Sequence, residues 1–222
     1  MMTKLPLMAL LCAGSISRSP LARLPQIRRY VRWVKASSYR VAARVTTALR
    51  AGVPVQDISE LQHVKFWLVY APAEDLSPII RELGTLGESL EGSQVIILDE
   101  ALAATGTENL RQLGAQVATF SPVEAEEKRY VMEGDPDALK TIRQLVDSPN
   151  SSKVVELKKG AKPEYIQGAL AATKSILPCV ADAVERFTNA GISAPEAKSI
   201  TEALVTESMR AYFRAGRRAI KS

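Results

Sequence analysis

The chain has 222 residues, of which 46% are apolar and 24% charged, a balance typical of a globular protein with one or two domains. Cys12 and Cys179 are far apart and lack C-x-x-C spacing, which excludes a disulfide framework and a cysteine zinc site. We expect both to be small buried hydrophobic residues. The single histidine, His63, excludes a multi-histidine metal site. No apolar run reaches the length of a membrane span, and we expect a cytoplasmic protein without a metal.

Charge is distributed unevenly along the chain. The first fifty residues contain ten Lys or Arg and no Asp or Glu, and the first acid is Asp57. Since the whole chain carries only +5, residues 51–222 carry a net charge of −5. Such a bias gives one end of the molecule a positive potential that attracts anionic ligands. We expect these cations to gather where the phosphates of a dinucleotide would lie in a doubly wound sheet.

The first 160 residues alternate between strand and helix patterns. The alternation predicts a Rossmann-like α/β fold, a doubly wound, mainly parallel sheet over residues 1–160. The apolar run at 5–12 also resembles a short signal peptide, yet its removal would cost this pattern its first strand. We expect strands at 5–12, 31–36, 64–70, 94–98, 116–120, 129–133 and 153–157, and helices at 21–30, 39–51, 77–83, 100–113 and 136–146.

Residues 161–222 show no strand pattern and predict a small all-α C-terminal domain. One helix is expected over 163–190, kinked at Pro178 and ended by Gly191. A second helix is expected over 193–219, opened by a capping box of Ser and Glu. Two helices do not make a core of their own. We therefore expect them to pack on the sheet domain and on the same tail of a second chain, giving a homodimer.

The turn after the first strand carries the first candidate ligand-binding residues. A dinucleotide site favours G-x-G-x-x-G here, because the glycines allow a tight turn and bring backbone N–H groups close to the pyrophosphate. In this chain the three glycine positions hold Cys12, Gly14 and Ser17. We assign Gly14, Ser15 and Ser17 to the cofactor site, with a plain turn that binds no ligand as the alternative.

The end of the second strand has the composition of a phosphate site. An NAD site usually places Asp or Glu here to bind the ribose hydroxyls, and this chain has neither. The stretch therefore favours NADP as the cofactor, with a solvated basic loop as the alternative. The groups expected to bind the 2′-phosphate are Lys35, Ser37, Ser38 and Arg40, with Arg18 from the first turn.

A third stretch follows the next buried strand at the carboxyl edge of the sheet. The backbone of Ala71 and Pro72 is expected to line the ribose of the cofactor. Glu74 and Asp75 are expected simply to begin the next helix, where the helix dipole favours acids.

Candidate catalytic residues lie at the start of the helical tail and further along it. Lys162, Tyr165 and Lys174 have side chains that donate a proton to a carbonyl or imine as hydride arrives. The alternative is structural, with Lys162 solvated at a helix start and Tyr165 packed against the sheet. The spacing of these residues does not decide between the two interpretations.

Three stretches together resemble a known group of enzymes: 35–40 with the helix after it, 130–135 before a helix, and 161–165 opening the tail. The arrangement resembles the uncharacterised Rossmann-like oxidoreductases of the 6-phosphogluconate-dehydrogenase-like superfamily, akin to pyrroline-5-carboxylate reductase and ketopantoate reductase. The resemblance covers nearly the whole chain. It implies NADP binding by the first domain and a helical domain of unknown function that forms a dimer and covers the nicotinamide. The chain departs from the pattern of the group at Cys12, Ser121, Ile166 and Lys174.

These observations predict an NADP-dependent oxidoreductase that acts on a small carbonyl or imine substrate. Two alternatives stay open. One is a non-catalytic Rossmann-like dimer with a degenerate nucleotide site, and the other is an anion or nucleic-acid binder that uses the N-terminal charge. The partners that we expect are a small-molecule substrate and a second copy of the chain, and we expect neither nucleic acid nor a membrane.

Overall fold

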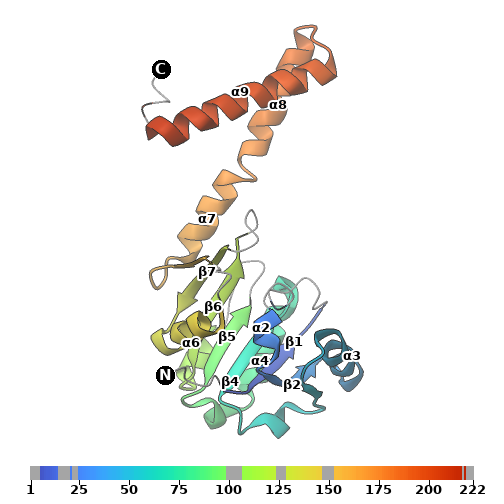
Figure 1. Cartoon of the computed structure of the whole chain (residues 1–222), viewed down its shortest axis with the longest axis vertical. Helices are drawn as coiled ribbons and strands as arrows, with labels where there is room; N and C mark the ends of the chain where they lie inside the picture. Colours follow the sequence, from blue (N-terminus) through green and yellow to red (C-terminus); the bar gives the residue numbers. More distant parts are fainter. Residues whose placement is uncertain are drawn as a thin grey trace. The chain divides into compact units, whose positions relative to one another are not determined.

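The computed structural model describes residues 6–14, 21, 25–98, 107–123, 129–146, 153–216 and 218. The chain divides into two compact units, Met1–Lys162 and Pro163–Ser222. In the described residues, every strand belongs to the first unit, coloured blue to yellow in Figure 1. The second unit contains helices, coloured orange to red.

A single sheet forms the centre of the first unit. Among the described residues it contains eight strands: β1 (Met8–Cys12), β2 (Val31–Ala36), β3 (Val53–Pro54), β4 (Phe66–Tyr70), β5 (Gln94–Leu98), β6 (Gln116–Pro122), β7 (Arg129–Gly134) and β8 (Lys153–Glu156). Their order is β3-β2-β1-β4-β5-β6-β7-β8. The first six strands in this order, from β3 at the edge to β6, are parallel to one another. Strand β7 runs antiparallel to β6, and β8 is parallel to β7. This order confirms the predicted doubly wound, mainly parallel α/β fold.

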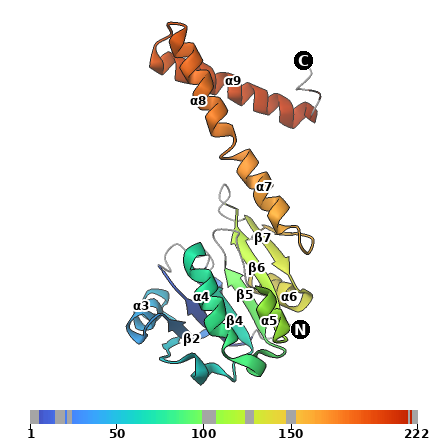
Figure 2. The same ribbon diagram turned by 180° about the vertical axis from the view of Figure 1, so that it is seen from behind.

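Helices cover both faces of the sheet. Figure 1 shows the face covered by α2 (Pro25–Arg28), α3 (Tyr39–Leu49) and α6 (Pro136–Val146). The opposite face, seen in Figure 2, carries α4 (Ala73–Gly84) and α5 (Thr107–Gln112) with the short helices η2 (Ile58–Leu61) and η3 (Gly87–Leu90). Successive strand residues point to opposite faces, so Leu10 lies in the first core and Leu11 in the second. All five residues of β1 are buried, because this strand is covered on both sides.

Two helices of the first unit begin or end at other residues than predicted. Within the helix expected over 21–30, Leu21 and α2 are helical, α2 ends at Arg28, and residues 22–24 lie outside the described part of the chain. Helix α4 begins at Ala73, earlier than predicted, with Glu74 and Asp75 in its first turn as expected.

The short elements β3 and η2 have no counterpart in the prediction, since such brief segments carry no recognisable period. The helix expected over 100–113 is present as α5, and residues 99–106 lie outside the described part of the chain. Strands β2 and β5 match the predicted bounds, because each is rich in strand-forming residues and bounded by turn signals.

The tail forms three helices, α7 (Lys162–Ala172), α8 (Ile176–Asn189) and α9 (Ala194–Ala215). The single kinked helix expected over 163–190 is wrong. The chain turns at 173–175, which places Pro178 in the first turn of α8, where its missing N–H breaks no helical bond. Gly191, with φ +89°, ends α8 as expected. The predicted capping box is not formed, because the Ser193 hydroxyl donates to the Glu196 carboxylate (2.7 Å) and caps no backbone N–H.

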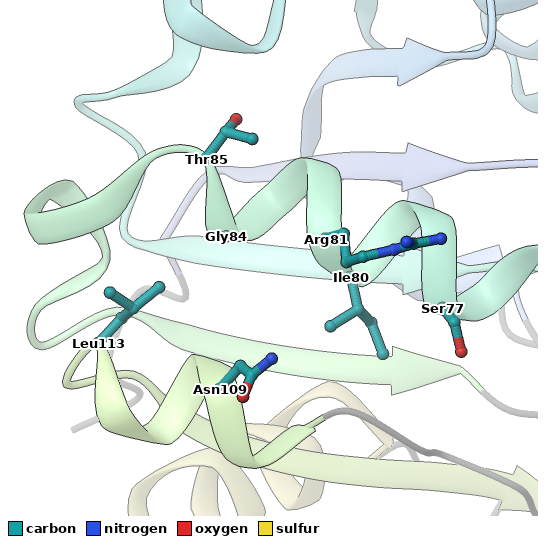
Figure 3. A pocket seen from close by; sticks show the side chains of 7 residues that line it. All are labelled: Ser77, Ile80, Arg81, Gly84, Thr85, Asn109 and Leu113. Carbon is teal, nitrogen blue, oxygen red and sulfur yellow. The ribbon is translucent and has the colours of Figure 1, made fainter.

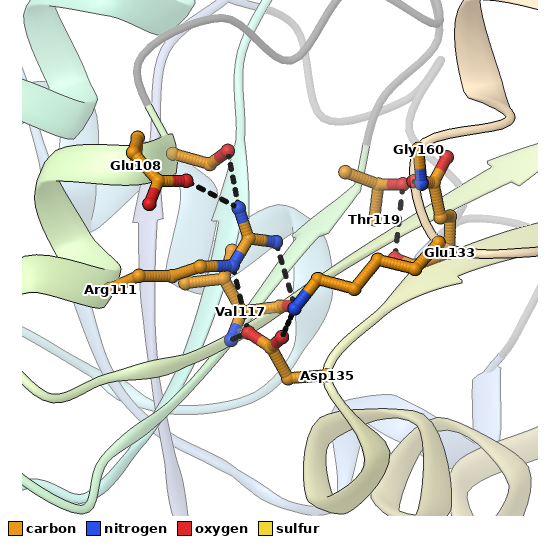
Figure 4. Close-up of polar contacts among 9 residues, drawn as sticks. Glu108, Arg111, Val117, Thr119, Glu133, Asp135 and Gly160 are labelled. Carbon is orange, nitrogen blue, oxygen red and sulfur yellow. Dashed lines mark hydrogen bonds and ion pairs between the residues drawn. The ribbon is translucent and has the colours of Figure 1, made fainter.

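A buried carboxylate connects three parts of the first unit (Figure 4). Asp135, after β7, accepts hydrogen bonds from Val117 N–H and Arg111 Nε, each at 2.9 Å, and from Lys159 Nζ at 3.1 Å. Arg111 lies on α5, and Lys159 lies in the turn that leads to α7. Burial raises the pKa of Asp135, but the hydrogen bonds from Val117, Arg111 and Lys159 together lower the pKa by more than burial raises it. The net pKa lies below the ordinary value, so this carboxylate stays charged.

Candidate functional site

The strand order reverses at β1, which pairs with β2 on one side and with β4 on the other. At the carboxyl end of β1, Cys12 is in register with Ala36 of β2 and with Tyr70 of β4. The loops that follow these three strands therefore leave the sheet side by side. Open α/β sheets bind ligands in the crevice that such a reversal opens. The fold thus brings together predicted cofactor residues from three separate stretches of the chain.

The loop after β1 passes close to the loop after β4. Ala13 N–H donates to the Tyr70 carbonyl at 2.9 Å, and Gly14 has φ +73°. A Cβ on Gly14 would lie 2.9 Å from Cγ of Pro72 and 3.1 Å from its Cδ, closer than side chains normally approach. Glycine is needed here for its conformation and for this close contact. The other residues predicted to lie in this turn, Ser15, Ser17 and Arg18, lie outside the described residues.

The loop after β2 leads directly into α3. Ser38 is the N-cap residue, and its Oγ accepts the Val41 N–H at 3.3 Å. The first turn of α3 contains no acid and carries Arg40. Ser37, Ser38 and Arg40 are all exposed. Because N–H groups and the dipole at a helix start favour a negative charge, this loop gives the crevice an edge suited to a phosphate.

Lys35 is placed differently from the other predicted phosphate ligands. It is only 8% exposed, and its Nζ donates to the Ala36 carbonyl at 2.7 Å and pairs with Glu82 of α4 at 2.8 Å. Strand β3 ends opposite Val34, so its ladder offers the Ala36 carbonyl no partner. The ammonium takes that place. In this structure Lys35 holds the end of β2, and its role at the 2′-phosphate stays a prediction.

Glu82 is the residue of this region that sequence reasoning missed. It lies on α4, far along the chain from Lys35, and an acid in an amphipathic helix carries no signal for such a pairing. The second missed feature, the N-cap role of Ser38, has a signal in the sequence, because a serine directly before a helical pattern is a preferred N-cap residue.

The charge pattern predicts that the cations of the first fifty residues gather at the crevice. The structure places some of them elsewhere. Helix α3 runs antiparallel to β2, because it connects two parallel strands, so Arg40 lies at the carboxyl edge of the sheet. Arg50, the C-cap of α3, lies at the opposite, amino edge. Arg32, the second residue of β2, lies near that same edge, where a Cβ on Gly52 would be 3.6 Å from the Arg32 carbonyl carbon. The prediction is therefore wrong for Arg32 and Arg50.

Cys12 occupies the first glycine position of the predicted fingerprint. It is 2% exposed and belongs to the core beneath α2, α3 and α6. Burial raises the pKa of its thiol to about 12, with the nearby charge of Lys35 opposing the rise. The thiol stays protonated and acts as a small apolar side chain. Cys179 on α8 is exposed, so the expectation that both cysteines are buried is wrong for this one.

The candidate catalytic residues lie around α7. Lys162 is its first residue and is half-buried, directly after a turn in which Gly160 N–H donates to Glu133 (2.5 Å). Tyr165 is also half-buried. The sequence predicts that Lys174 lies on a helix. It is instead exposed in the turn between α7 and α8. Lys162 belongs to the first unit and the other two to the second, and the catalytic role of all three stays a prediction.

A pocket of about 470 Å³ lies between α4 and α5 (Figure 3). Ile80 of α4 and Asn109 of α5 point toward each other across it, and Leu113 closes one end. Its walls are mainly apolar, and no predicted cofactor residue lines it. We therefore assign the pocket no part in cofactor binding.

No protein-family model matches the sequence, and no curated protein matches it in sequence. Solved structures do match in fold. Pyrroline-5-carboxylate reductase from Coxiella burnetii aligns with a TM-score of 0.59 and 11% identity over 96% of this chain and 82% of the other. Imine reductase from Aspergillus terreus, in a complex with NADPH4, gives 0.70 and 12% over 99% and 79%. The V8 variant of imine reductase from Myxococcus stipitatus, in a complex with NAD+, gives 0.66 and 13% over 97% and 78%.

At these identities the likeness establishes the fold. It confirms the Rossmann-like architecture that the sequence resemblance implies, and the similar structures are oxidoreductases of the expected kind. Within the described segments, no helix combines the length and the apolar character that a membrane crossing requires.

Proposed function

We propose that the first unit binds a nicotinamide dinucleotide at the carboxyl ends of β1, β2 and β4, and that the protein is an NADP-dependent oxidoreductase for a small carbonyl or imine. When bound, this cofactor supplies a hydride. The similar structures support a nicotinamide cofactor of either kind, and the acid-free loop after β2 favours NADP. The residues proposed to hold it are Gly14, Ser15, Ser17 and Arg18 at the pyrophosphate, Ser37, Ser38 and Arg40 at the 2′-phosphate, and Ala71 and Pro72 at the ribose.

The observation that carries this proposal is the contact between Gly14 and Pro72 at the point where the strand order reverses. A residue without a side chain, at φ +73°, keeps two loops close together there. Beside it stands a helix start that carries a cation and no acid. This combination fits a ligand with several phosphates.

Gly14→Ala should weaken NADPH binding by at least about tenfold, because the new Cβ forces Pro72 or the turn to move. The measurement is a fluorescence titration of NADPH and NADH. Gly92→Ala is the matched control, because Gly92 has φ +66° and no atom within 4 Å of its Cβ position. It shares the backbone cost and should leave the affinity unchanged. Absence of NADPH binding by the unmodified protein would refute the cofactor site. Equal NADPH affinities of Gly14→Ala and Gly92→Ala would show that Gly14 is not part of this site.

Arg40→Ala should lower the affinity for NADPH by about tenfold to a hundredfold, since a hydrogen bond to a charged group contributes roughly 1.5–3 kcal/mol. The affinity for NADH should hardly change. Arg44→Ala, one turn further along α3, is the control and should leave the preference for NADPH intact. Lys35→Met should lower the Tm and affect both cofactors equally, because Lys35 is paired with Glu82. Equal losses of NADPH and NADH with Arg40→Ala would refute the 2′-phosphate assignment.

For catalysis, we propose Lys162 as the proton donor, supported by Tyr165 and Lys174. An ammonium or phenol supplies the proton that a carbonyl oxygen or imine nitrogen gains when it is reduced. The alternative is a nucleotide-binding protein without turnover, and Cys12 in place of a fingerprint glycine favours it. Consumption of NADPH in the presence of small ketones and cyclic imines separates the two. Binding without consumption supports the non-catalytic alternative.

We propose that the helical unit pairs with a second copy of itself. Helices α7 and α8 bury no residue in the part of the chain described, and α9 buries only Ala197 and Thr201. Soluble monomers rarely leave so much apolar surface in water. The exposed apolar side chains of this unit are Leu177, Ile200, Leu204, Met209, Tyr212 and Phe213, of which Phe213 is 81% exposed.

Phe213→Asp should weaken the dimer by at least about tenfold, because it places a charge on the most exposed of these apolar side chains. Sedimentation velocity over a range of protein concentrations measures this. Ser199→Asp adds the same charge at an exposed polar position of the same helix and should have little effect. A protein that sediments as a monomer before any substitution would exclude the dimer.

A further inference from the structure

Much of the N-terminal positive charge lies away from the cofactor crevice. Of the exposed arginines of the first fifty residues, Arg40 lies near the crevice. Arg44 follows it on α3, and Arg50 and Arg32 lie at the opposite edge of the sheet. We call Arg40, Arg44 and Arg50 the arginine surface. The proposed cofactor site leaves two of these three cations without a role.

Helix α3 carries the centre of the arginine surface on its outer side. Its apolar residues Ala42, Val45 and Leu49 are buried against the sheet. Arg40 and Arg44 are four residues apart and therefore share the opposite, exposed side. Like charges at this spacing destabilise an isolated helix, so this pair of arginines lowers the stability of α3.

No acid balances this charge in the described segments. The first acid of the chain is Asp57, after α3 and β3, and no ion pair is formed by the arginine surface within the described residues. Elsewhere the pattern differs. Arg111 pairs with Asp135, Arg143 with Glu156, and Arg186 with Asp182. The arginine surface is therefore an unneutralised strip, about 15 Å long on α3 alone at 1.5 Å per residue.

Contrary to the expectation from the sequence, we propose that the arginine surface binds the phosphate backbone of a single-stranded nucleic acid. Guanidinium groups match phosphate geometry, and the surface presents three of them, all exposed. Tyr39, 50% exposed beside Arg40, offers a ring on which a base stacks. A lipid surface fits less well, because the apolar side chains of α3 are buried and none is left to enter a bilayer.

The test is fluorescence anisotropy of labelled single-stranded RNA and DNA at increasing salt. Removing two backbone contacts should lower the slope of log affinity against log salt by about 1.4 and weaken binding about tenfold. The variant is Arg44→Gln and Arg50→Gln together, which leaves Arg40 for the cofactor. Its control is Lys140→Gln and Lys198→Gln, which removes the same charge from exposed positions elsewhere.

The proposal predicts that only the first variant loses nucleic acid, while both keep the Tm and the NADPH affinity of the parent protein. Binding that fails in the parent protein overturns it, as does an equal loss in both variants. Tighter binding to a duplex, or to anionic vesicles but not to the single strands, also overturns it. NADPH titration of the same samples keeps this result separate from the fate of the proposed cofactor site.

Discussion

Gly134→Ala should lower the Tm of the first unit by about 10 °C or more, a loss of at least roughly 4 kcal/mol. Gly134 ends β7, has φ +155°, and is in register with Ala118 of β6. A Cβ at this position would overlap the Cα and Cβ of Ala118 and the carbonyl oxygen of Val117. Because two of these atoms belong to the backbone, no side-chain rotation relieves the overlap. The antiparallel pair β6–β7 would have to separate.

Gly160→Ala is the matched control for this substitution. Gly160 has φ +81°, and no atom lies within 4 Å of its Cβ position. Its replacement carries only the cost of an unfavourable φ, about 1–2 kcal/mol. Thermal unfolding followed by circular dichroism compares the two variants. Similar Tm values for both would show that β6 and β7 are not paired in this register.

Most of the sheet was accessible to sequence reasoning because its strands are apolar runs that end at turn residues. Strand β5 (Gln94–Leu98) shows this well, with four buried apolar residues between polar loops. The clearest error lies in the tail. The turn at 173–175 divides the expected single helix, so Pro178 falls in the first turn of α8 and does not kink a continuous helix.

The candidate site was partly predictable for a topological reason. Once the sheet is parallel and doubly wound, the loops after β1, β2 and β4 must meet, so Gly14 and Pro72 lie together. Contacts between side chains do not follow from topology. The pairing of Lys35 with Glu82 depends on the depth at which α4 packs, which periodicity does not encode.

The prediction that the N-terminal cations gather at one place fails for a geometric reason. A helix that connects two parallel strands reverses direction, so the two ends of α3 face opposite edges of the sheet. A run of cations across a strand and a helix therefore spreads over the molecule and does not converge on one point. Counting charges along the chain misses this, and the strand-helix order already contains it.

Asp135→Ala should lower the free energy of unfolding by about 3 kcal/mol, or the Tm by roughly 6–12 °C. Asp135 is 7% exposed, and its removal leaves the Val117 N–H and Arg111 Nε without their acceptor. Lys159 contributes little, since its side chain is 72% exposed and solvent screens the pair. Urea titration measures the loss. Asp137→Ala is the control. This exposed acid stands in the first turn of α6, which begins directly after Asp135, and contributes at most about 1 kcal/mol to stability.

The pH dependence distinguishes the charge of Asp135 from its shape. Hydrogen bonds hold the pKa of Asp135 below its ordinary value, so the carboxylate stabilises the folded state above the unfolded pKa, and this contribution is lost as pH falls through the folded pKa. Asp135→Asn keeps the shape without the charge. The stability difference between the parent protein and Asp135→Asn should therefore be full at neutral pH and shrink below about pH 4. A difference that stays constant down to acid pH would show that the network depends on packing and not on the ionised carboxylate.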